Sequence, residues 1–361
     1  MNEKRLVVLL TRYEADEIVR HEAHRLIEDG VDWYKVFILA LNNKVIGLVY
    51  YNLIRFGLMC KIKPILYNLM KYYYLCNARR NKYIISEKKR ILNELNRNGV
   101  NVLSLKGGVL LERIYKDWGS RACNDLDFYC KLENIEQLGK ILKGIGYKQG
   151  EIDWNQQKIV NFSRIKKMGW KVNMNTIPTY IRKIEDNEYI DFLELDFSYS
   201  FDLRKDVSIS KTVFDRSCNN EMDISDTIIY LCSHLYKEAE NDIWIEAKAD
   251  MNLIKFCDIR EMVICLDKEN VRYLVERALE LNCAEAVYYC AYFLQIIYEE
   301  KMFEDLMVMF SHYGYELRET RYDKLDFSED TRNRFWNRIF SFDNSVVLLD
   351  ERFKENKRMI E

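Results

Sequence analysis

The hydrophobic pattern changes from helical to strand-like spacing near residue 99, and this change constrains the fold more than any other feature. Before it, apolar residues recur at helical spacing, as in residues 33–53. After it, Val100–Leu105 is short, apolar and β-branched at its start, which is typical of a buried strand. It runs directly into Lys106-Gly107-Gly108 and a helical pattern. Only two prolines and thirteen glycines occur in 361 residues, which disfavours a turn-rich all-β fold.

Two further strands are expected after this turn, at Asp125–Cys130 and Phe192–Tyr199, with a helix between them that begins near Ile135. From Ile224 onward the helical spacing returns. The pattern therefore predicts three consecutive parts. They are an N-terminal helical region (1–98), a mixed α/β core (99–215) and a C-terminal helical region (216–361).

Charge, cysteine spacing and apolar runs limit the class of protein. The formal net charge is −2, which disfavours a protein that coats a polyanion. The ten cysteines form no C-x-x-C pair, and several lie in apolar helical patterns, so buried free thiols in a reducing compartment are expected. Leu6–Leu10 is too short for a signal peptide, and the apolar stretch Val45–Met59 is interrupted by Asn52 and Arg55. We expect a cytoplasmic protein that does not cross a membrane.

Asp125 and Asp127 are the first candidate site residues. On a strand, residues two apart face the same side, so both carboxylates project together while Leu126 points to the other face. Two carboxylates this close repel each other unless a cation lies between them. A pair of Mg²⁺ ions about 3.5–4 Å apart provides that charge and suits in-line displacement at phosphorus.

A third carboxylate and a phosphate-binding turn complete the pattern. Glu194 and Asp196 share one face of the last strand. Gly107 and Gly108 have no side chains to block the backbone, and they lie where a strand turns into a helix. The free N–H groups at the start of such a helix favour a triphosphate.

These motifs resemble a known family. Lys106-Gly107-Gly108, Arg121 and Asn124-Asp125-Leu126-Asp127 look like the G-G…D-x-D signature of the DNA polymerase β-like nucleotidyltransferase superfamily. The most similar pattern is that of its bacterial "uncharacterised nucleotidyltransferase" family, whose later strand reads acidic–Leu–His–Trp. Here that strand reads Glu194-Leu195-Asp196-Phe197, so Glu194 takes the third-carboxylate place and the role of Asp196 stays open. The resemblance covers about residues 30–300.

The resemblance implies an α+β fold, with a polymerase β-like core of mixed sheet and helices between two helical segments. It implies an enzyme that uses two Mg²⁺ ions to move a nucleoside monophosphate from an NTP to a hydroxyl or phosphate. The acceptor, a small molecule, sugar or peptide, is not identified. The implied metal-binding and catalytic residues are Asp125, Asp127 and Glu194, and the implied nucleotide-binding residues are Lys106, Gly107, Gly108 and Arg121.

Several alternatives stay open at the level of sequence. Lys158–Lys183 contains seven basic and no acidic residues, which fits either a solvated hairpin or a site for a triphosphate or an anionic acceptor. Aromatic residues interleave with it, so a single-stranded RNA acceptor is a further alternative. The Lys106–Asp127 pattern also resembles abortive-infection-type toxins that modify tRNA. A tailoring enzyme or a non-catalytic binding protein on the same fold would carry the same residues.

Overall fold

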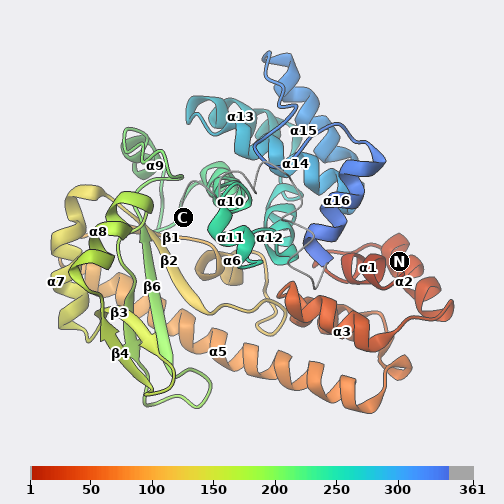
Figure 1. The fold of residues 1–361 in the computed structure, drawn as a ribbon, viewed down its shortest axis with the longest axis horizontal. Helices are drawn as coiled ribbons and strands as arrows, with labels where there is room; N and C mark the ends of the chain where they lie inside the picture. Colours follow the sequence, from red (N-terminus) through yellow and green to blue (C-terminus); the bar gives the residue numbers. More distant parts are fainter. Residues whose placement is uncertain (1, 341–361) are drawn as a thin grey trace, which may run out of the picture. The chain divides into compact units, whose positions relative to one another are not determined.

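The computed structural model describes residues 2–340 and contains one six-stranded mixed sheet accompanied by helices (Figure 1). The chain forms two compact units. The sheet unit consists of residues 46–230, and the helical unit combines residues up to 45 with those from 231 onward. The three consecutive parts suggested by the sequence stay a prediction, and residues 341–361 at the end of the third part lie outside the described residues.

The sheet has the strand order β1-β2-β6-β5-β3-β4. Strands β2 and β6 are parallel, and the other pairs are antiparallel. The strands are β1 (Val102–Ser104), β2 (Asp125–Cys130), β3 (Lys148–Asp153), β4 (Lys158–Asn161), β5 (Tyr180–Lys183) and β6 (Phe192–Ser198). Three of these six, β1, β2 and β6, are the strands that the hydrophobic pattern predicts.

One face of β2 and β6 forms the core of the sheet unit. Leu126, Phe128, Leu195 and Phe197 are fully buried, and the rings of Phe128 and Phe197 stack 5.0 Å apart. The long helix α5 (Pro64–Arg97) packs against β2 and against α7 (Ile135–Gly144), and Gly139 of α7 lies against the side chain of Tyr180 in β5. Alternation along each strand therefore leaves the acidic residues on the opposite face.

The other helices that lie wholly within the sheet unit have at most ten residues. They are α4 (Ile46–Arg55), α6 (Gly107–Arg113), α8 (Arg164–Asn173) and α9 (Ser210–Asp215), with 3₁₀ turns at Met59–Lys61 and Leu132–Asn134. Helix α4 approaches the loop before β2 very closely, because a Cβ on Gly47 would lie 2.5 Å from the carbonyl oxygens of Gly119 and Ser120. Only glycine allows this helix–loop contact.

The helical unit is built around α14 (Ala284–Tyr298), whose side chains are almost all buried. The N-terminal segment of this unit contributes α1 (Asn2–Leu9), in which Leu6–Leu9 are fully buried. The remaining helices are α2 (Glu17–Glu28), α3 (Trp33–Asn42), α11 (Asp242–Glu246), α12 (Leu253–Val263), α13 (Lys268–Glu280), α15 (Lys301–His312) and α16 (Glu329–Phe340). Helix α10 (Ile224–Ala239) contains the boundary between the two units.

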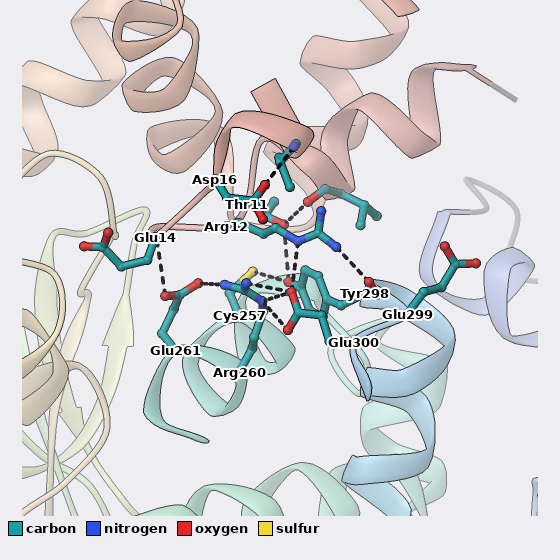
Figure 2. Close-up of polar contacts among 12 residues, drawn as sticks. Thr11, Arg12, Glu14, Asp16, Cys257, Arg260, Glu261, Tyr298, Glu299 and Glu300 are labelled. Carbon is teal, nitrogen blue, oxygen red and sulfur yellow. Dashed lines mark hydrogen bonds and ion pairs between the residues drawn. The ribbon is translucent and has the colours of Figure 1, made fainter. Parts of the chain in front are cut away.

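A buried polar network joins the N-terminal and C-terminal segments of the helical unit (Figure 2). Arg12 donates a 2.7 Å hydrogen bond to the carbonyl oxygen of Tyr298 and lies 3.3 Å from the carboxylate of Glu300. The backbone N–H of Tyr13 donates to Glu261 at 3.0 Å. Because a buried charge needs a partner, these contacts fix which segments pack together.

The ten cysteines are free thiols, as the spacing predicts. Six are buried, but Cys60, Cys76, Cys218 and Cys265 are exposed, which the sequence pattern did not indicate. Within the described residues, no helix has both the length and the apolar content that crossing a membrane requires.

Candidate active site

The parallel pairing of β2 with β6 brings two pairs of acidic residues to one face of the sheet. In the register, Asp125 lies opposite Glu194 and Asp127 lies opposite Asp196. Because residues two apart on a strand share a face, all four side chains project from the side opposite the phenylalanine core.

Three of the four carboxylates form a tight cluster. Oxygen atoms of Asp125, Asp127 and Asp196 all lie within 4.8 Å of one another. Asp196, which the sequence left without a role, is thus placed with the two predicted metal ligands, and it accepts a 2.6 Å hydrogen bond from the Thr179 hydroxyl. Glu194, the predicted third carboxylate, lies opposite Asp125 on the same face and is not a member of this cluster.

Lys106 contacts the cluster from the turn between β1 and α6. Its Nζ lies 2.7 Å from Oδ1 of Asp127. Its backbone has φ 43° and ψ −128°, a conformation that favours glycine and costs a lysine about 1–3 kcal/mol. The ion pair with Asp127 helps to hold this lysine where a glycine would be less strained.

Gly107 and Arg121, both predicted nucleotide-binding residues, lie against each other. A Cβ on Gly107 would be 2.7 Å from Nη1 of Arg121 and 2.6 Å from Sγ of Cys123. The structure therefore gives Gly107 a packing role beside the predicted phosphate-binding role. The carbonyl oxygen of Gly108 accepts a 2.6 Å hydrogen bond from Lys88 of α5, which fixes the start of α6.

The loop that carries Arg121 is held by Asn81 of α5, a residue that belongs to no recognised sequence motif. Asn81 is fully buried, and its Nδ2 donates to the carbonyl oxygens of Trp118 and Arg121, each at 2.7 Å. Its Oδ1 accepts from the N–H of Cys123 at 3.2 Å. An asparagine within a helical pattern is the only signal in the sequence, and its partners lie about forty residues further along the chain.

Burial and the charge of Asp127 make Asp125 and Asp196 costly to ionise. Both effects raise the pKa of Asp125, with Asp127 as the main neighbouring charge. Burial, followed by the charge of Asp127, raises the pKa of Asp196 to about 6. The pKa of Glu194 is raised by burial and by Asp125. Lys106 opposes the pKa shifts of Asp125 and Asp196, and a bound cation would do so more strongly.

The raised pKa of Asp125 predicts that Asp125→Asn stabilises the metal-free protein at alkaline pH. The folded state keeps a proton that the unfolded chain releases above about pH 4, so wild-type stability falls as the pH rises toward the folded pKa. We expect the variant to be about 1–3 kcal/mol more stable at pH 8, with a smaller difference at pH 5. Urea unfolding in EDTA at both pH values measures this. If the variant and the wild type differed in unfolding free energy by the same amount at both pH values, the raised pKa of Asp125 would not be the cause.

The basic segment Lys158–Lys183 is divided among β4, α8 and β5. Arg182 lies on the face opposite the acidic cluster, because its register partner is Leu193, and it pairs with Glu87 of α5 at 2.9 Å. Lys166 of α8 pairs with Glu151 of β3. These two cations are therefore engaged in contacts within the sheet unit.

The chemistry of the donor set fits a divalent metal ion. Carboxylate oxygens from adjacent strands are the hard ligands that Mg²⁺ prefers, and their clustering leaves a negative charge that Lys106 alone only partly offsets. Together with a mixed sheet between helices, this is the architecture expected of a nucleotidyltransferase core.

Comparison with known proteins identifies the family. A family model described as "Uncharacterised nucleotidyltransferase" matches residues 29–299, which is most of the chain. The chain therefore belongs to this family, and the resemblance over residues 30–300 is confirmed. Neither the curated proteins nor the solved structures gave a match to the chain.

Proposed function

We propose that the protein transfers a nucleoside monophosphate from an NTP to a hydroxyl or phosphate group of an acceptor, with two Mg²⁺ ions. The observation that supports this most directly is the cluster of Asp125, Asp127 and Asp196, whose oxygens approach within 4.8 Å on the sheet of a nucleotidyltransferase. In this reaction the acceptor oxygen bonds to the α-phosphorus and pyrophosphate leaves.

The proposed metal ligands are Asp125, Asp127 and Asp196. Mg²⁺ bound at such carboxylates offsets phosphate charge and makes an acceptor hydroxyl easier to deprotonate. We infer that Glu194 accepts the proton of the acceptor, and its position opposite Asp125 on the same face of the sheet supports this role. Burial and the charge of Asp125 raise the pKa of Glu194, which makes it a stronger base than an ordinary glutamate.

The proposed nucleotide-binding residues are those of the Lys106-Gly107-Gly108 turn together with Arg121. Lys106 contacts Asp127, and Arg121 packs against Gly107, so one cation lies at the cluster and the other lies beside the turn. Both supply positive charge for the triphosphate. Asn81 positions Arg121 by binding its backbone carbonyl.

Calorimetric titration of each NTP with Mg²⁺ tests this function. We expect the wild type to bind at least one NTP only when Mg²⁺ is present. The Asp125→Asn/Asp127→Asn variant should bind it at least about 100-fold more weakly. Glu185→Gln, at an exposed position outside the cluster, is the matched control and should bind like the wild type. No Mg²⁺-dependent binding to the wild type, or unchanged binding to the double variant, would overturn the proposal.

A further inference from the structure

Helix α8 has an apolar face that no part of the described chain covers. Ile165, Met168 and Val172 expose 85%, 64% and 67% of their surface, and their spacing places them along one side of the helix. No residue of α8 is buried. Since an isolated helix of this length is only marginally stable in water, the missing burial points to a surface that is completed by another molecule.

The opposite side of α8 is anchored to the sheet unit. The indole N–H of Trp170 donates to the Thr176 hydroxyl at 3.1 Å, and its ring lies 5.6 Å from that of Phe162. Ser163 caps the N-terminus by accepting from the N–H of Lys166 at 3.1 Å. These contacts hold the helix in place with its apolar row turned away from the chain.

A second row, made of cations, runs beside the apolar row. Arg164, Lys167 and Lys171 each precede one residue of the apolar row, so they have the same spacing and form a parallel stripe. All three are exposed. The segment from Asn155 to Ile184 contains no acidic residue, so nothing within it neutralises this stripe.

We propose that α8 docks an acidic amphipathic helix of a partner protein, and that this partner carries the acceptor. The second part rests on the function proposed above. A helix with its own apolar row, flanked by Asp or Glu, complements both stripes of α8. Trp170 of α8 donates to Thr176, which bridges to Ser198 of β6, two residues beyond Asp196, so the docked partner would be held near the acidic cluster.

Two other occupants fit the surface less well. An aliphatic row cannot stack on bases, whereas single-stranded RNA is bound mainly by aromatic stacking and cations. A second copy of the chain, docked symmetrically, would bring the two cationic stripes together.

The test uses the 361-residue chain and a synthetic peptide of about 18 residues that carries a fluorescein label. The peptide forms a helix with one row of leucines and one row of glutamates, in the spacing of the two rows of α8. Fluorescence anisotropy should show binding that weakens as salt is raised. Met168→Ser/Val172→Ser and Lys167→Glu/Lys171→Glu should each weaken binding at least about tenfold. The charge-reversed variant should instead bind a lysine version of the peptide. Leu132→Ser and Lys143→Glu, at exposed positions outside α8, are matched controls and should bind like the wild type.

The same assay separates docking from catalysis. Asp125→Asn/Asp127→Asn should bind the peptide with wild-type affinity, because the carboxylates take no part in docking. Absence of peptide binding, or binding that neither α8 variant weakens, would overturn the proposal. So would α8-dependent binding to anionic phospholipid vesicles or to polyuridine without binding to the peptide.

Discussion

Asp196→Asn is expected to weaken Mg²⁺-dependent NTP binding about 100-fold, while Glu194→Gln weakens it less than about fivefold. The reason is the register of β2 and β6, which places Asp196 opposite Asp127 and within 4.8 Å of both other aspartates. Asparagine has nearly the same shape and still accepts the hydrogen bond from Thr179, so the change removes charge with little change in packing. Titration with the NTP that the wild type binds measures both variants.

Circular dichroism and urea unfolding provide the control for this comparison, since both variants should be at least as stable as the wild type. If Glu194→Gln proves the more damaging change, the third ligand is Glu194, as the family pattern in the sequence suggested. Equal losses would show that both carboxylates of β6 take part in binding.

Gly47→Ala is expected to destabilise the protein by about 2–4 kcal/mol, although alanine is the better helix former by about 1 kcal/mol. The added methyl group would lie 2.5 Å from two backbone carbonyl oxygens, those of Gly119 and Ser120, which cannot move as a side chain can. The midpoint of urea unfolding measures the loss.

Gly169→Ala provides the matched comparison, because it lies within α8 and a Cβ there meets nothing within 4 Å. Here helix propensity acts alone, and stability should stay equal or rise by up to about 1 kcal/mol. A Gly47→Ala variant that is as stable as Gly169→Ala would show that α4 does not approach the loop as closely as described.

Local patterns predicted the elements that carry the acidic residues. Strand β2 runs from Asp125 to Cys130, as its alternation indicates, and β6 and the helix after Gly107 also lie where they were expected. The pattern succeeds there because each of these strands has one apolar face against the phenylalanine core, which the sequence shows directly.

Proposing Asp196 beside Glu194 as a metal ligand needed the structure. Both lie on the same face of β6 and each lies opposite an aspartate of β2, so only the distances between carboxylate oxygens distinguish them. Those distances depend on packing between segments almost seventy residues apart. Asn81 was missed for a similar reason, because it acts through three hydrogen bonds to a loop about forty residues further along the chain. Helix α8 was missed because none of its residues is buried and its apolar residues alternate with basic ones, so no strong helical hydrophobic pattern marks it.

The helical unit consists of two chain segments separated by the sheet unit, and this determines the order in which the units can fold during synthesis on the ribosome. Arg12 is synthesised 286 residues before Tyr298, whose carbonyl oxygen it binds, and Leu6–Leu10 precede it. At about 5–20 residues per second, the intervening sheet unit takes roughly 10–40 s to synthesise. The sheet unit therefore has time to fold before the C-terminal segment of the helical unit is made. During that time the apolar residues of the N-terminal segment are unburied and accessible to chaperones.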